Sequence, residues 1–141
     1  MSQYDQMIVE TLRYPGVNFG GGTTTQNLPV PRGAQFARVL DLQVIASATF
    51  TQVTTPAEVQ IGDGTTANKF SQLTVGGLVA GSSITGNDQT GGTWISNYIA
   101  GNYNSGAGLH DLVATFVAPT GGTPAGTGDV IIILGWDQIE R

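Results

Sequence analysis

The chain has 141 residues, enough for one domain, and 40% of them are hydrophobic while only 11% are charged. This composition argues against a disordered chain, because disordered chains lack the apolar surface that offsets the backbone entropy lost on folding. The net charge is −5, with five Lys and Arg residues in all, which argues against a direct contact with nucleic acid, since such a contact requires clustered basic side chains.

The first residues predict neither export nor a membrane anchor. Residues 1–10 are acidic and lack the basic start and apolar centre of a signal peptide. The sequence contains no run of about 18 apolar residues, the length that spans a bilayer. We therefore expect a protein that is made in a cytoplasm and does not contact a membrane.

Residues 1–33 show no clean periodicity and are predicted to form an extended N-terminal arm. The segment 4–12 fits either a helix or a strand, and the glycine- and proline-rich residues 15–31 follow it. About 20 residues without a regular pattern are unusual inside a compact domain. An arm lying on a neighbouring subunit and a frayed terminus both fit this pattern. The apolar residues assigned to arm contacts are Tyr4, Met7, Ile8, Leu12, Tyr14 and Phe19.

Residues 34–141 are predicted to form a β-sandwich domain that begins with a long strand. From Phe36 to Phe50 the apolar residues fall mainly on even positions and the polar residues on odd ones, as in a strand with one apolar face. Val39 and Ile45 break the alternation and suggest a β-bulge or a partly covered second face. The run exceeds an average strand of about 5–6 residues, so it is either bent or shared between two sheets.

A hairpin and further short strands are expected next. Asp63-Gly64 separates the apolar segments 57–61 and 69–75, and Asp-Gly at such a place favours the primed turn of a β-hairpin. Short strands are also expected around Ile84 and at 93–100.

The last part of the chain predicts two strands separated by a loop. In residues 109–118 alternate apolar residues share one face, and residues 119–128 have the composition of a loop. Residues 129–136 contain a continuous apolar run that begins at Val130, which predicts a central strand buried on both faces. Seven or eight short strands with glycine-rich turns predict an all-β fold, a β-sandwich of the jelly-roll kind.

The titratable residues do not predict an enzyme. His110 is the only histidine, and its neighbour Asp111 would lie on the opposite face of a strand, so the two cannot form a catalytic pair. With one histidine and no cysteine, a zinc site is not expected. Asp63, Asp88 and Asp129 could supply oxygen ligands to calcium, although turn formation explains loop aspartates better. We expect no catalysis, no cofactor and no bound metal.

One segment has the composition of a binding surface. In residues 87–108 three aromatic residues, Trp94, Tyr98 and Tyr103, lie among Asn, Ser and Gly, a combination found in adaptable contact surfaces. Such a surface could contact a protein or stack against a sugar ring. The simpler interpretation of Trp94 and Tyr98 is that they cap the sandwich core.

Two segments resemble parts of a known family. Residues 59–70 have the sequence VQIGDGTTANKF, which resembles a β-hairpin of small virion proteins of tailed bacteriophages, and residues 119–136 resemble their closing loop and strand. In its general pattern of short strands and glycine-rich turns, the resemblance covers residues 34–136, and it points to head decoration (cement) proteins. It implies a non-enzymatic β-sandwich or jelly roll that is a homotrimer, binds the major capsid protein on the outer capsid surface of the virion, and has terminal arms reaching across capsomers.

The sequence therefore predicts a structural protein that strengthens a capsid through many protein contacts. An acidic chain suits the outside of a DNA-filled shell, because phosphates inside would repel it. The alternative is a tail or fibre module that recognises a receptor or carbohydrate through Trp94, Tyr98 and Tyr103. The arm hypothesis further implies that a chain without residues 1–33 still folds.

Overall fold

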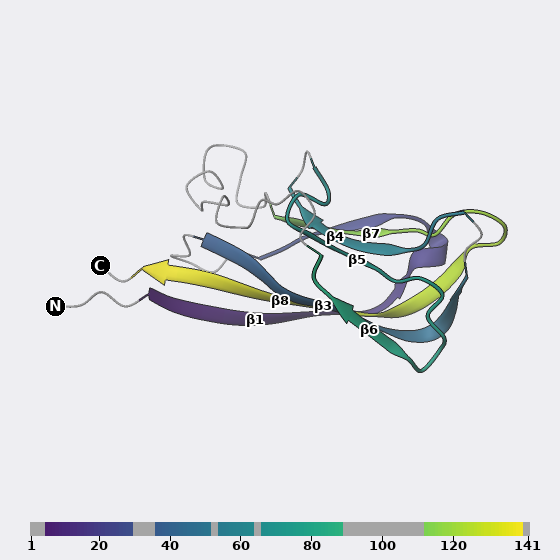
Figure 1. Cartoon of the computed structure of the whole chain (residues 1–141), viewed down its shortest axis with the longest axis horizontal. Coiled ribbons are helices and arrows are strands. Elements are labelled where there is room, and N and C mark those ends of the chain that lie inside the picture. Colours follow the sequence, from purple (N-terminus) through teal and green to yellow (C-terminus); the bar gives the residue numbers. More distant parts are fainter. Residues whose placement is uncertain (1–4, 30–35, 52–53, 64–65, 89–111, 140–141) are drawn as a thin grey trace.

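Two four-stranded antiparallel sheets form two layers of the molecule (Figure 1). The computed structural model describes residues 5–29, 36–51, 54–63, 66–88 and 112–139. Sheet A contains, in order across the sheet, β1 (Asp5–Asn18), β8 (Ala125–Ile139), β3 (Phe36–Thr51) and β6 (Ser83–Gly86). Sheet B contains, in order, β2 (Thr24–Asn27), β7 (Val113–Val117), β4 (Glu58–Gly62) and β5 (Ser71–Thr74). The prediction of an all-β sandwich is confirmed.

The strands pair in a nested order. β1 pairs with β8, β2 with β7, β3 with β6 and β4 with β5, and the pairs β3–β8 and β4–β7 complete the two sheets. Among the described strands only β4 and β5 are consecutive strands of one sheet, so every other step from one described strand to the next crosses from one sheet to the other. In Figure 1 the long strands β1, β3 and β8 run on toward the chain ends, past the strands of sheet B.

The inner faces of the two sheets meet in one hydrophobic core. Its most buried large side chains include three phenylalanines whose rings touch: Phe19 lies 5.2 Å from Phe50 and 6.0 Å from Phe116 between ring centroids. Trp136 is fully buried at the end of the core row of β8. These aromatic side chains contribute much of the buried apolar area that stabilises a sandwich.

The prediction of an N-terminal arm is wrong for residues 5–28. β1 pairs with β8 from Asp5 to Asn18, the 3-10 turn η1 (Phe19–Gly21) follows, and β2 pairs with β7. Phe19 and Leu28 are fully buried in the core. The segment 4–12, left open between helix and strand, forms a strand as far as it is described. Its backbone amides and carbonyls bind β8, so this segment folds with its own chain rather than on a neighbour.

The long strand β3 contains the predicted irregularity. Its pairing with β8 shifts between Val39 and Asp41, so Leu40 is the extra residue of a bulge. Val39 is buried, whereas Leu40 is exposed, which reverses the faces that strict alternation assigned to them. From Leu42 to Ala46 the alternation is as expected, with Leu42, Val44 and Ala46 buried. Ala48 is exposed instead of buried, because the register with β8 shifts again between Ala46 and Ala48 and between Ala48 and Thr51.

The hairpin around Asp63 is confirmed by the pairing of β4 with β5. Asp63 fixes the part of the turn that is described: its backbone amide donates to the carbonyl of Thr66, and its carboxylate accepts the amide of Thr66 at 2.6 Å and contacts Lys69 at 3.2 Å. An Asp side chain that binds nearby backbone amides is a common turn device. This role explains Asp63 without a metal ion.

The strand β8 is central in sheet A, as predicted, but is buried on one face only. Val130, Ile132 and Leu134 are fully buried against sheet B, whereas Ile131 and Ile133 are half-buried. The strand also begins earlier than expected, at Ala125, inside the segment predicted to be a loop.

Candidate functional site

The predicted aromatic surface cannot be located on the fold. Trp94, Tyr98 and Tyr103 lie outside the described residues, as do Tyr4 and the candidate base His110. Their predicted roles stay predictions.

The predicted arm contacts that are described belong to the sandwich. Ile8, Leu12 and Tyr14 pack against the core and Phe19 is inside it, while Met7 is placed only as a backbone position of β1. The signal that sequence reasoning missed is an alternation of inward and outward residues over positions 8–14. The inward positions 8, 12 and 14 are apolar, but the inward position 10 is a glutamate, which interrupts the pattern.

Glu10 shares the inner side of β1 with these apolar residues. It stands opposite the buried Leu134, and its Oε1 atom is buried without a hydrogen-bond partner. Burial raises the pKa of Tyr14, and the charge of Glu10 raises it further. A carboxylate at this inner position obscures the strand pattern in the sequence, because a charged residue is normally assigned to the outward face of a strand.

The parts of the chain that the structure describes contain no group of three or more His, Asp or Glu side chains that could hold a metal ion. Asp88 is held through its backbone, which pairs with Gln72 in both directions, and Asp129 binds groups on β1. Within the same residues, no helix is long and apolar enough to cross a membrane.

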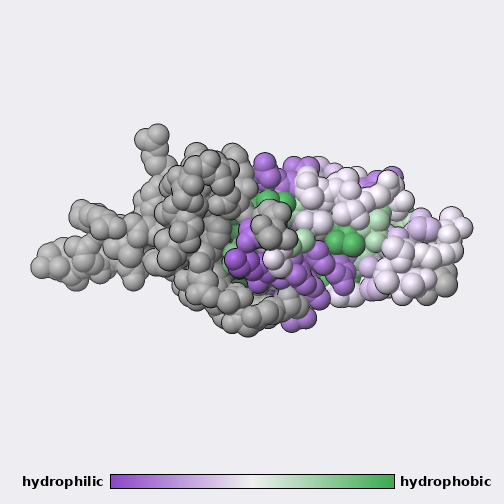
Figure 2. Space-filling model, turned by 90° about the horizontal axis from the view of Figure 1, so that it is seen from above, coloured by the Kyte–Doolittle hydropathy of each residue, from purple (hydrophilic) through white to green (hydrophobic). Residues whose placement is uncertain are grey.

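The outer face of sheet B is polar but almost uncharged. A row of hydrogen-bonding side chains crosses all four strands in register, formed by Thr25, Thr115, Gln60 and Gln72. Glu58 is the only charged residue in these four strands, and its carboxylate accepts a hydrogen bond from Gln60 at 2.8 Å. Figure 2 views this side of the molecule, where hydrophilic and neutral residues dominate the coloured surface.

The outer face of sheet A is more apolar. Ile131 stands between Arg13 and Gln43, and Ile133 stands between Thr11 and Asp41. Beside them, Val9 of the edge strand β1 is 58% exposed. No strand or helix of the described chain packs over this face, since sheet B covers the opposite one.

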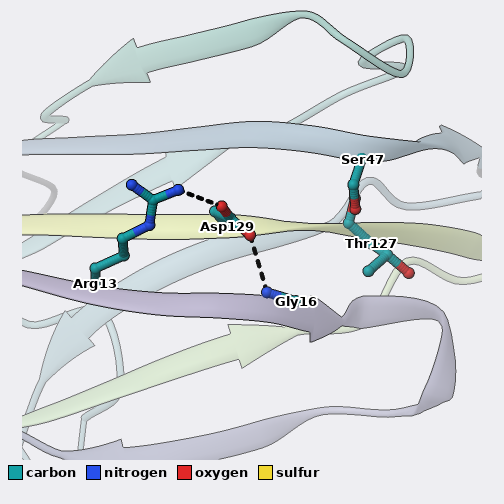
Figure 3. Close-up of polar contacts among 5 residues, drawn as sticks. All are labelled: Arg13, Gly16, Ser47, Thr127 and Asp129. Atoms are coloured by element: carbon teal, nitrogen blue, oxygen red, sulfur yellow. Dashed lines mark hydrogen bonds and ion pairs between the residues drawn. The ribbon is translucent and has the colours of Figure 1, made fainter.

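One charged cluster borders this face (Figure 3). Between Tyr14 and Val17 the pairing of β1 with β8 shifts, and Pro15 and Gly16 bulge out opposite Asp129. The Asp129 carboxylate accepts the amide of Gly16 at 2.9 Å and forms an ion pair with Arg13 at 2.5 Å. The bulge takes Pro15 and Gly16 out of the β1–β8 ladder, since proline has no amide hydrogen and Gly16 adopts a φ of 64°. The amide of Gly16, which has lost its ladder partner, donates to the Asp129 carboxylate instead.

The hydrogen bond from Gly16 and the Arg13 guanidinium hold the pKa of Asp129 below its ordinary value. A lowered pKa means that the ionised form is favoured by folding, so this stabilisation is present above the unfolded pKa, about 3.9, and is lost as the pH falls through the folded pKa. Asp129→Asn is therefore expected to be less stable than the natural chain at pH 7, with the difference shrinking toward pH 2. Urea unfolding at both pH values measures this, and an equal difference at both would contradict it.

No model of a known protein family matches the chain, and a comparison with curated proteins finds no match. The described strands of sheet B contain one charged residue, Glu58, whereas the outer side of sheet A includes Arg13, Asp41 and Asp129 beside its isoleucines.

Proposed function

We propose that this protein is a non-enzymatic structural component of a virion that decorates and stabilises the capsid of a tailed bacteriophage through protein–protein contacts. Its proposed partners are the major capsid protein and other copies of itself, on the outer capsid surface. It would be made in the cytoplasm of the host.

The strand order supports this proposal. We infer that the sandwich is a jelly roll, because the nested pairs β1–β8, β2–β7, β3–β6 and β4–β5 are those of a long hairpin rolled into two sheets. Jelly rolls are common in viral capsid proteins and also occur in lectins. The fold alone does not determine function, so the argument depends on the surface.

The observation that carries the proposal is the apolar outer face of β8. The run Val130–Leu134 has the sequence of a strand covered on both sides, yet only its inner residues are covered by the described part of a single chain. Covering Ile131 and Ile133 with a neighbouring protein would remove further apolar surface from water, at about 25 cal/mol per Å². A chain that works in an assembly accounts for this pattern.

The mechanism of stabilisation would be multivalent contact. Several weak contacts made by one linked assembly act together, because each bound contact raises the effective concentration of the next. Since residues 5–28 belong to the sandwich, these contacts fall to the sheet faces rather than to a long arm. The net charge of −5 keeps the protein away from packaged DNA and suits the outside of the shell.

The location of the chain on particles tests the proposal. An antibody raised against the purified protein is expected to label the heads of intact tailed phages, collected from a bacterial culture that makes this protein and releases phage particles. Immuno-electron microscopy measures the label. Label confined to tails or fibres would instead favour the receptor- or carbohydrate-binding alternative. Label found only in the soluble fraction of the cells would refute a structural role in the virion.

A further inference from the structure

We propose that two copies of this chain pair antiparallel along the open edge of β1, around a two-fold axis at Val9. The two four-stranded A sheets would then join into one continuous sheet. This inference is drawn from the edge strand itself and stands whether or not the protein decorates a capsid. It adds a two-fold contact, which differs from the homotrimer that the resemblance implies.

The first observation is the length of the unpaired edge. Among the described strands β1 pairs with β8 alone, and it is 14 residues long, whereas the other edge strands β2, β5 and β6 have four residues each. An unpaired strand edge presents a row of backbone donors and acceptors to any strand of matching length. Among the described edge strands, β1 offers the longest such row.

The second observation is that this stretch has few of the devices that protect an open edge. Natural proteins block open edges with lysine, proline, a bulge, a very short strand or an inward-pointing charge, and Glu10 is the one inward-pointing charge among the described side chains of this stretch. In β1 the proline and the bulge both come after Tyr14, and the register with β8 is unbroken from Asp5 to Tyr14. The same stretch contains no lysine.

The third observation is an exposed apolar residue at the middle of this stretch. Val9 is 58% exposed, and among the described residues only Leu40 and Val79 are also exposed large hydrophobics. A β-branched residue favours strands and packs well against a partner across a strand pair. At a two-fold axis Val9 would pack against the Val9 of the second copy.

The charges select the register. With Val9 opposite Val9, Asp5 of each copy stands opposite Arg13 of the other, so two pairs of opposite charge close the ends of the ladder. Moving the axis to Glu10 would set two glutamates against each other and bring Pro15 into the ladder, both of which are unfavourable. Arg13 has five donors, so its ion pair with Asp129 leaves further donors available at the paired edge.

Cross-linking tests the register, because the natural chain has no cysteine. Directly opposed residues of an antiparallel pair are about 4.5–5.5 Å apart between Cα atoms, within the range that a disulfide bridges. Val9→Cys is expected to give a covalent dimer on mild oxidation of a dilute solution. Two controls should stay monomeric on denaturing gels: Val79→Cys, equally exposed at 59%, and Thr11→Cys, which would face Met7.

Sedimentation tests the dimer without cross-linking. The unmodified protein is expected to sediment as a dimer, and Val9→Lys as a monomer, because two ammonium groups would meet at the axis. Val79→Lys is the matched control and should stay dimeric. Circular dichroism checks that both variants fold; should Val9→Lys unfold, the Val9→Cys result decides. A monomer at all concentrations, a trimer unchanged by Val9→Lys, or equal cross-linking of Val9→Cys and Val79→Cys would overturn the proposal.

Discussion

Deletion of residues 1–33 is expected to abolish folding. It removes β1 from one edge of sheet A and β2 from one edge of sheet B, which leaves the inner strands β8 and β7 without one of their two neighbours. It also removes Phe19 and Leu28 from the core, where both are fully buried. Truncating either side chain to alanine alone costs about 2–5 kcal/mol, and a domain has only about 5–15 kcal/mol in total.

Far-UV circular dichroism and an amide NMR spectrum measure the outcome. The truncated chain should show no cooperative thermal unfolding and no dispersed amide signals. A deletion of residues 1–4, which ends before β1 begins, is the control and should melt like the whole chain. Phe19→Ala should lie between them, folded but about 3–5 kcal/mol less stable. A cooperative transition in the long deletion would restore the interpretation of this segment as an arm.

The sequence predicted the strands, and the parts of strands, in which the alternation is undisturbed. In β3 the buried residues Leu42, Val44 and Phe50 fall on the expected even positions, and the Asp-Gly signal located the hairpin of β4 and β5. Such patterns depend on the period of the strand alone, and the chain shows them wherever one face is buried and the other is polar.

The edge strand β1 was missed because two local signals conflict with its fold. Glu10 occupies an inner position, and Pro15-Gly16 looks like the end of an element although the strand continues to Asn18 past a bulge. Asp129, which binds the bulge, lies more than a hundred residues away in the sequence. A single sequence does not reveal this pairing, since proline normally ends regular structure and nothing local compensates for it.

The outer face of β8 shows the opposite kind of error. The run Val130–Leu134 predicts cover on both sides, and the described chain supplies cover on one. A run of consecutive apolar residues does not specify whether its second face is covered by the same chain or by another one. The intermediate exposure of Ile131 and Ile133 is what the proposed assembly would explain.

The second large effect is expected at Gly126, near the start of β8. Its φ is 152°, a conformation that residues with a side chain rarely adopt, and a Cβ atom there would overlap the ring of Phe50. Phe50 is only 2% exposed and packs against Phe19, so its ring has little room to move. Backbone strain of about 1–3 kcal/mol and overpacking of about 1–3 kcal/mol combine in Gly126→Ala.

Two other glycines separate these contributions. Gly22 has a φ of 127°, and no atom lies within 4 Å of the position that a Cβ atom would take. Gly22→Ala should therefore lose only the stability that the backbone strain costs. Gly77 has open space and an ordinary φ, so Gly77→Ala should be neutral or slightly stabilising. The free energy of unfolding in urea is expected to fall most for Gly126→Ala, less for Gly22→Ala, and not at all for Gly77→Ala.

A double variant then tests the cause at Gly126. If the overlap with the Phe50 ring is responsible, replacing that ring by a smaller side chain should relieve it, so Gly126→Ala and Phe50→Leu together should lose less stability than the sum of the two single changes. Strict additivity would show that the backbone conformation at Gly126, and not the ring beside it, limits this position. In that case the two positive-φ variants, Gly126→Ala and Gly22→Ala, should lose similar amounts of stability, because each would carry only the strain of its own backbone.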